Sequence, residues 1–454
     1  MNKVVKLLFI NTLVLIVSAV CPSQISAQQN ALYEIPGLLT VNSLIREYSP
    51  GKDVVFNQDG RSCFLLVERQ TGMVTEAEVN GLSHVADMEI EGDTLYFCGT
   101  YGTDQVIGYF DINDLFTGTN QVNIVTIPYM PIVGGYIGAL TVRKLEVLTY
   151  AANDVHVFVL GDLVFGAPPS VAPDYTCIVD AMFDGVTWTE EVIYEPVGIY
   201  FMDDLAVTKN YLMVIGDKHD GTGDYWTCWS LPSIGNSPLS FANLPLTNKP
   251  IYSTPDIDYY PISRPLIELR DEDTCVVASY GQFEGKYGVV LSLYNNPFTL
   301  ADRWLVPDVA GAREFRDLKY NSCRRTISLV PDYFNTLCKD ILYMFDLQNI
   351  QVQAFQTNLP GVYSVDALQG NPGAVASGVT KNGMVGIWRV DTAECECSRY
   401  MDLIVQQNIH QIGICYADFV SGNSKTAQYV EVATVQTLNL DKLCGDEVFK
   451  KQSE

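Results

Sequence analysis

An acidic residue followed directly by an apolar one recurs along this chain, and each copy precedes short runs typical of β-strands. The clearest copy begins at Asp87-Met88, continues through TLYFCG and VIGYFDI, and ends at Phe110-Asp111. Similar copies begin at Asp204-Leu205, Asp317-Leu318 and Asp366-Ala367, and a partial one begins at Asp418-Phe419. Since the period is roughly 50 residues and each unit consists of short strands, the chain is expected to fold into an array of similar sheets.

The unit ends GYFDI, LYMFDL and GIWRVD complete a pattern that resembles β-propellers in general. The pattern lacks the regular Gly-His and Trp-Asp marks of WD40 repeats and the double Gly of kelch repeats. The resemblance implies one all-β domain over residues 28–454, closed into a ring of four-stranded blades. Six complete units and one blade shared by the N- and C-terminal segments make seven blades. Eight is the alternative, if Asp53 and Asp418 each open a blade of their own. A propeller fold by itself implies no particular function.

Residues 1–27 have the features of a secretory signal peptide. Lys3 and Lys6 precede the apolar run Leu7–Val20, and Ile25-Ser26-Ala27 offers small residues for cleavage after Ala27. Lipidation at Cys21 and an uncleaved anchor are the alternatives. The mature chain has no further apolar stretch long enough to cross a bilayer. The sequence therefore predicts a protein that is secreted, periplasmic or on the cell surface.

The chain is strongly acidic, with a formal net charge of −25 that becomes −27 once Lys3 and Lys6 are removed. This charge argues against nucleic acid and against anionic lipid surfaces, because both require clustered Lys and Arg. With 48% hydrophobic residues the chain can still bury a large core. We expect a monomer whose partner is an extracellular protein or a glycan.

The aspartates that open the units are the first candidate site. If each unit begins with the innermost strand of a blade, these side chains lie at equivalent heights around the central channel. A ring of carboxylates could bind a cation or a basic ligand. Alternatively, each Asp accepts backbone N–H bonds and fixes the position of the neighbouring blade. The residues concerned are Asp87, Asp204, Asp317, Asp366 and Asp418.

The loop with Asp217, Asp220 and Asp224 is the candidate calcium site, although its spacing does not match an EF-hand. A solvated hairpin tip explains the same residues. The sequence therefore predicts no cofactor, with calcium at this loop as the alternative.

The cysteines are scattered singly, and those inside apolar runs are predicted to be free and buried. Cys63, Cys98, Cys228 and Cys275 are of this kind. Cys323 and Cys338 flank the turn signal Pro331-Asp332, so they could form a disulfide across a hairpin.

Two further groups are candidates for ligand binding. Arg313 and Arg316 belong to the basic cluster of the chain and could bind a carboxylate, or could pair internally with Glu314 and Asp317. Tyr259 and Tyr260 follow a loop-like stretch and could stack on a sugar or a protein.

The sequence shows no G-x-S-x-G elbow, no H-E-x-x-H helix and no P-loop. We therefore predict a non-catalytic binding module for an extracellular protein or glycan. The alternative is an extracellular carbohydrate-active hydrolase or lyase, with carboxylates at the channel mouth as acid and base.

Overall fold

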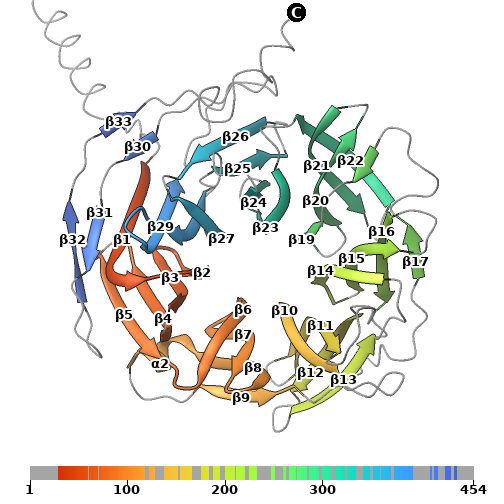
Figure 1. Cartoon of the computed structure of the whole chain (residues 1–454), viewed down its shortest axis with the longest axis horizontal. Coiled ribbons are helices and arrows are strands. Elements are labelled where there is room, and N and C mark those ends of the chain that lie inside the picture. The colour runs from red at the N-terminus through yellow and green to blue at the C-terminus, as the bar shows by residue number, and fades with distance from the viewer. Residues whose placement is uncertain are drawn as a thin grey trace, which may run out of the picture.

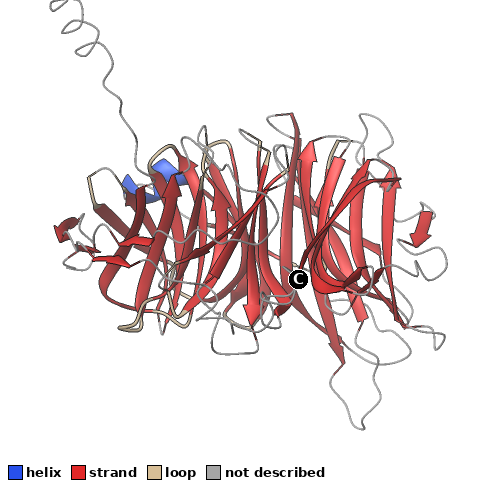
Figure 2. Ribbon diagram, turned by 90° about the horizontal axis from the view of Figure 1, so that it is seen from above, coloured by secondary structure: helices blue, strands red, loops and turns tan. Residues whose placement is uncertain are grey.

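The computed structural model describes residues 29–436, with longer gaps at residues 128–137, 166–174, 233–246, 251–258, 334–340, 392–408 and 418–424 and shorter gaps in other loops. Antiparallel sheets surround a central axis, and in most of them the strand that comes first in the chain lies innermost (Figure 1). Viewed from the side, the strands run between two faces of a disc (Figure 2). This arrangement is an all-β β-propeller.

Six blades are each built from one continuous stretch of the chain. The first three contain β2 (Asn42–Ser49), β3 (Lys52–Asp59), β4 (Arg61–Glu68) and β5 (Met73–Glu78); β6 (Leu82–Glu91), β7 (Thr94–Tyr101), β8 (Asp104–Asp111) and β9 (Asn123–Thr126); and β10 (Gly138–Ala151), β11 (Asp154–Phe165), β12 (Tyr175–Phe183) and β13 (Trp188–Tyr194).

The next three continue around the axis in the same way. They contain β14 (Tyr200–Val207), β15 (Tyr211–His219), β16 (Asp224–Pro232) and β17 (Thr247–Pro250); β18 (Tyr259–Pro261), β19 (Leu266–Asp271), β20 (Thr274–Phe283), β21 (Lys286–Asn295) and β22 (Thr299–Pro307); and β23 (Ala312–Asn321), β24 (Thr326–Tyr333), β25 (Ile341–Asp346) and β26 (Gln351–Gln356).

A further sheet joins the two ends of the described chain. It contains β27 (Gly361–Ala367), β28 (Ala374–Val379) and β29 (Met384–Asp391), and β1 (Gln29–Leu39) pairs antiparallel with β29. In this composite sheet Gln29 lies opposite Asp391, and Ile35 lies opposite Val385. Strand β27 also contacts β2 of the first blade.

The count of six continuous blades differs from the seven or eight that the sequence predicted. The segment before Asp87 does not need the C-terminal segment, because β2 to β5 already form four strands. The strands around Asp418 do not open a blade either. Instead β31 (Ile414–Ala417) and β32 (Lys425–Val430) extend the first sheet, where Lys425 lies opposite Val74 of β5. Strands β30 (Ile409–Gln411) and β33 (Thr434–Gln436) pair with each other.

Hairpin turns occur where the sequence places turn residues. Gly92 lies between β6 and β7 with φ +62°, and Gly383 lies between β28 and β29 with φ +78°. Glycine reaches this left-handed region without the steric cost that a Cβ imposes. The segment Val41–Tyr48 forms most of β2. The described helix is the single short α2 (Ile112–Thr117). Within the described residues no helix has the length and apolar character needed to cross a membrane.

The hydrophobic core lies between neighbouring blades. Phe64 of β4 packs against Phe97 of β7 and Phe110 of β8, with ring centroids 5.3 and 5.0 Å apart. All three rings are buried. Cys63, Cys98 and Cys275 are free and buried, as the sequence predicted. The blades therefore leave polar side chains concentrated along the axis, on the innermost strands.

Candidate functional site: the channel mouth

The innermost strands place side chains around the channel in two layers. A β-bulge lies just before the first layer on several of these strands, for example between Val85 and Asp87 and between Met202 and Asp204. The second layer lies two residues further along each strand and therefore on the same side of the strand. We call the first layer the mouth ring, made of Leu44, Asp87, Lys144, Asp204, Leu266, Asp317 and Ser364. We call the second the inner ring, made of Arg46, Glu89, Glu146, Ala206, Glu268, Lys319 and Asp366.

The unit-opening aspartates connect neighbouring inner strands. Asp204 accepts the N–H of Leu205 on its own strand and the N–H of Ile267 on β19, both at 3.0 Å. The same pair of bonds recurs at other aspartates: Asp87 with Met88 and Leu145 (2.9 and 3.3 Å), Asp317 with Leu318 and Val365 (3.0 and 3.0 Å), and Asp366 with Ala367 and Glu47 (2.9 and 2.6 Å).

These bonds are those that the structural interpretation of the aspartates predicted. Asp87, Asp204 and Asp317 lie at one height in the mouth ring. Asp366 lies in the inner ring and not at the height of the other three, because Ser364 occupies the mouth-ring position of β27. Asp418 lies outside the described residues.

Replacing Asp204 with Asn is expected to lower the free energy of unfolding by about 1–3 kcal/mol. The amide has one acceptor oxygen, so either the Leu205 or the Ile267 N–H would face an NH₂ group. The matched control is Asp111→Asn, since Asp111 accepts the Asn113 and Asp114 N–H groups through one oxygen, which Asn retains. Urea unfolding would measure both, and equal effects would contradict the connecting role of Asp204.

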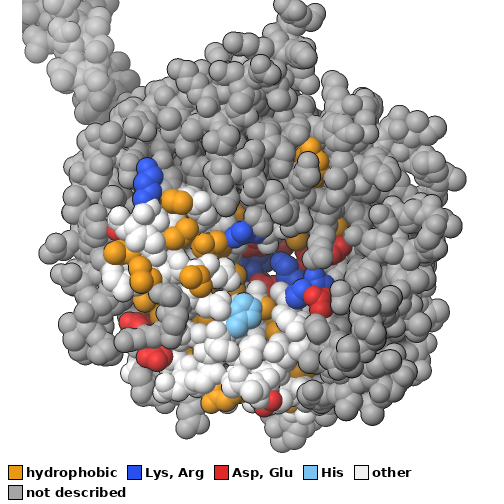
Figure 3. All heavy atoms as spheres, in the orientation of Figure 1, with side chains coloured by type: hydrophobic (Ala, Val, Ile, Leu, Met, Phe, Trp, Pro, Cys, Tyr) orange, Lys and Arg blue, Asp and Glu red, His pale blue; other side chains and the backbone are white. Residues whose placement is uncertain are grey.

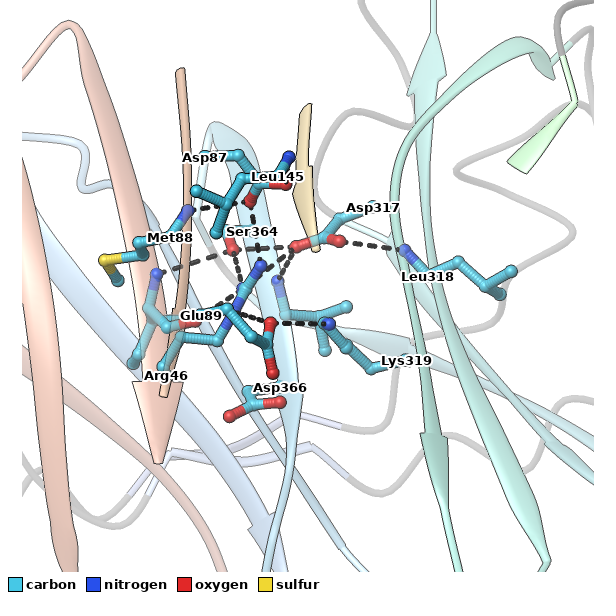
Figure 4. A network of polar contacts seen from close by, with 12 residues as sticks. Arg46, Asp87, Met88, Glu89, Leu145, Asp317, Leu318, Lys319, Ser364 and Asp366 are labelled. Carbon is cyan, nitrogen blue, oxygen red and sulfur yellow. Dashed lines mark hydrogen bonds and ion pairs between the residues drawn. The ribbon is translucent and has the colours of Figure 1, made fainter. Parts of the chain in front are cut away.

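Arg46 lies at the centre of the inner ring and reaches into the mouth ring (Figure 4). Its guanidinium contacts Asp87 at 3.0 Å, Glu89 at 3.5 Å and Asp317 at 3.7 Å. Its NH1 group also donates to the Ser364 hydroxyl at 3.2 Å. Burial acts to raise the pKa of Asp317, but Arg46, Lys144 and Lys319 outweigh it and the pKa is lowered. Asp317 is therefore ionised at neutral pH.

The inner ring contains more carboxylates than cations. Lys319 contacts Glu89 at 3.3 Å and Glu268 at 3.7 Å, and Arg46 is the other cation of this ring. Burial raises the pKa of Glu268 to about 7 and that of Asp366 to about 6. Burial also raises the pKa of Glu146 well above its usual value. The excess negative charge in the channel is therefore reduced by protonation.

The protein is expected to lose stability as the pH rises from about 4.5 to 7. Glu268 has a raised pKa, so its contribution is complete below its ordinary value of 4.5 and is lost as the pH rises through about 7. One such proton changes stability by at most about 1.4 kcal/mol per pH unit. Asp317 has a lowered pKa, so its contribution is lost only at lower pH, below its usual value of 3.8.

Urea unfolding at a series of pH values would measure this dependence. Glu268→Gln mimics the neutral carboxyl group, so we expect a smaller decrease over the same range. Identical pH profiles of the wild type and Glu268→Gln would show that Glu268 does not titrate in this window.

A cavity of about 430 Å³ lies directly above the mouth ring, toward the ends at which the inner strands begin. This size suits a small ligand or one unit of a larger one. The face seen in Figure 3 is hollowed at its centre, and basic and acidic side chains gather around the hollow. The polar residues that line the cavity are His84, Asp87, Thr141, Arg143, Lys144, Asp203, Arg316, Asp317 and Tyr363.

Most of the charged groups at the cavity already have partners in the protein. Arg143 pairs with Asp162 at 2.9 Å and donates to the backbone oxygen of Met202 at 2.5 Å. Arg316 lies over the Tyr363 ring, 5.1 Å from its centroid. The oxygens of Asp87 and Asp317 accept the backbone N–H groups described above. The cavity therefore presents few groups that remain available to a ligand.

The other ligand-binding candidates from the sequence are only partly at the cavity. Arg316 is at the cavity, whereas the Arg313 side chain is outside the described part. Tyr259 and Tyr260 belong to β18 and not to a loop, because their backbones pair with Phe283 and Gln282 of β20.

The calcium loop and the disulfide remain predictions. Asp217 and Asp224 belong to β15 and β16, while Asp220 lies outside the described residues. Among the described residues no cluster of His, Cys, Asp and Glu is suited to hold a metal ion. Cys323 and Cys338 also lie outside the described residues.

Sequence reasoning missed the cations on which the site depends. Arg46 lies in a segment without a recognisable copy of the repeat, so no signal pointed to it. Lys144-Leu145 occupies the position of Asp-apolar in its unit, and this substitution of an acid by a base is the signal that could have identified Lys144.

No protein-family model matches the chain, and the comparison with curated proteins gives no match either. Solved structures with a similar fold include an oligogalacturonate lyase from Vibrio parahaemolyticus (TM-score 0.49, 10% identity, covering 81% of this chain and 97% of that one). The β-propeller domain of the Trilobed protease from Pyrococcus furiosus has a TM-score of 0.45 at 9% identity, and the match covers 80% of this chain and 97% of that one. A puromycin-hydrolyzing peptidase from Mycobacterium tuberculosis has a TM-score of 0.47 at 11% identity, and the match covers 82% of this chain and 56% of that one. At this level of similarity, the likenesses carry no information about function.

Proposed function

We propose that this protein is a non-catalytic binding module that receives part of an extracellular protein or glycan in the mouth cavity. The proposal rests on the hydrogen bonds that the carboxylates at the cavity already accept from the protein. Asp87 accepts two backbone N–H groups and the Arg46 guanidinium, and Asp317 accepts two backbone N–H groups and the Ser364 hydroxyl. These oxygens hold blades together, so little of their hydrogen-bonding capacity is left for a substrate.

The same observation argues against the alternative of a carbohydrate-active hydrolase or lyase. A glycosidase needs one carboxyl group that is protonated at working pH and reaches the leaving oxygen. Asp317 has a lowered pKa and is ionised, and its contacts to Leu318, Val365 and Ser364 fix it within the ring. A binding site whose carboxylates are held in place by these contacts fits them better than an acid–base pair.

The location and the ring closure belong to the same proposal. Cleavage after Ala27 would release a secreted, periplasmic or surface-exposed monomer of residues 28–454, and N-terminal sequencing of the exported protein tests this. We further take the composite sheet of β1 with β27, β28 and β29 as the element that closes the ring. Support for it comes from the β1–β29 pairing and from the bond between Asp366 and the Glu47 N–H on β2.

The mature chain, labelled and applied to a glycan array and a panel of extracellular proteins, tests the binding function. Thr141→Trp introduces a large side chain at an exposed residue of the cavity wall and is expected to abolish binding of the ligands found. The matched control is Thr103→Trp at the exposed turn between β7 and β8, which should bind like the wild type. Turnover of a carbohydrate substrate, or unchanged binding by Thr141→Trp, would contradict the proposal.

A further inference from the structure

Lys144 differs from the other charged residues of the mouth ring in having no short-range partner. Within the described part of the chain, no carboxylate oxygen lies within 4.0 Å of its ammonium nitrogen, while Arg46 and Lys319 both have such contacts. The side chain lines the cavity. Burial acts to lower its pKa, but Asp204, Asp87 and Asp317 outweigh this effect and raise it. An ammonium group with three N–H donors therefore stays charged beside the cavity.

The nearby carboxylates do not replace a ligand at this ammonium. Both carboxylate oxygens of Asp87, and both of Asp204, already accept backbone N–H groups from two adjacent strands. They favour the charged form of Lys144 from a distance without satisfying its donors directly. The donors of Lys144 are thus available to an acceptor that enters the cavity, and a charged acceptor forms the stronger hydrogen bond.

His84 adds a second contact of defined polarity. Gln58 donates through Nε2 to the Ser83 backbone oxygen at 3.4 Å, which orients its Oε1 toward His84 Nδ1 at 3.0 Å. Nδ1 must then carry the proton, and burial lowers the pKa of His84, so the ring is neutral. Its Nε2 is left as a hydrogen-bond acceptor, which suits a hydroxyl group.

We propose that the mouth cavity binds an acidic sugar, with the ammonium of Lys144 on the carboxylate and His84 Nε2 accepting a hydroxyl group. This inference rests on the proposed binding function and names the chemical class of its ligand. The C-terminal carboxylate of a peptide shares the anionic group but lacks the neighbouring hydroxyl groups. The two sources can therefore be separated by choice of probe.

The test measures binding of three small probes to the mature chain by calorimetry or ligand-observed NMR. They are glucuronate, its uncharged methyl ester, and acetyl-Ala-Ala with a free C-terminal carboxylate. We expect glucuronate to bind at least about tenfold more tightly than the ester, because a charge-assisted hydrogen bond is lost in the ester. This comparison uses the wild-type protein and does not depend on the folding of a variant.

Variants of Lys144 then assign the effect to this residue. Lys144→Gln should remove the preference for glucuronate, Lys144→Arg should retain most of it, and Lys381→Gln at an exposed turn should leave it unchanged. Equal binding of glucuronate and ester, or binding of neither, overturns the inference. Binding of acetyl-Ala-Ala without glucuronate overturns the acidic sugar in favour of a peptide. In each case the array result with Thr141→Trp stands separately, so failure of the ligand class and failure of the binding function remain distinguishable.

Discussion

Replacing Arg46 with methionine is expected to lower the free energy of unfolding by about 3–5 kcal/mol. Arg46 is the cation shared by Asp87, Glu89 and Asp317, and its own side chain is only 4% exposed. Methionine fills a similar volume but leaves these carboxylates without their common partner in a region of low dielectric. Removing one member of a buried ion pair costs more than the pair contributes, because the remaining charge stays desolvated.

Urea unfolding of the purified mature chain measures this loss. The control is Lys381→Met, which removes one positive charge at an exposed turn and should change stability by no more than about 0.5 kcal/mol. The double variant Arg46→Met with Glu89→Gln should recover part of the loss, since one uncompensated carboxylate is then neutral. An effect of Arg46→Met no larger than that of Lys381→Met would show that the channel charges are solvated and need no central cation.

The fold could be predicted from the sequence because its signal is local and repeated. Each copy of the repeat that begins at residues such as Asp87 or Asp317 includes residues of the inner strand and of the strands that follow. Periodicity alone therefore indicated blades around an axis. The sequence predicted that the chain ends share a blade, but the segments that pair could not be read in this way. Strand β1 pairs with β29 across the whole sequence, and this long-range pairing leaves no periodic signal in the segment Gln29–Leu39.

The candidate site was predictable only in part, for a related reason. The aspartates were found because they repeat, and repetition marks a structural role, as their bonds to the next inner strand show. The residues with individual chemistry are those that break the repeat. Lys144 stands where other units have Asp, and His84 acquires its polarity from Gln58 of another blade. Contacts between blades bring together residues far apart in sequence, which composition and spacing do not reveal.

A second buried cation, Arg69, connects the first blade to the composite sheet. It follows β4 in the chain and donates to both oxygens of Asp53, at 2.8 and 3.1 Å, and to Glu47. Glu47 in turn accepts the Gln369 N–H, and its backbone oxygen accepts the Gln369 side-chain amide at 3.1 Å. The side chains of Arg69, Asp53 and Glu47 are at most 2% exposed. We expect Arg69→Met to lower the free energy of unfolding by about 3–5 kcal/mol.

Two comparisons make this prediction specific to burial. Lys52→Met removes an adjacent surface cation that pairs with Glu68 at 2.8 Å and is 43% exposed, so it should cost at most about 1 kcal/mol. Burial raises the pKa of Asp53 to about 7 even though Arg69 acts to lower it. Removing Arg69 therefore raises this pKa further, and Asp53, which loses its cation together with Glu47, becomes an unpaired charge only above pH 7. The Arg69→Met variant should therefore be least stable above pH 7, and Asp53→Asn introduced into it should restore stability there. A loss that is the same at pH 5 and pH 8, or that Asp53→Asn fails to reduce, would mean that Arg69 acts through packing of its aliphatic chain and not through its charge.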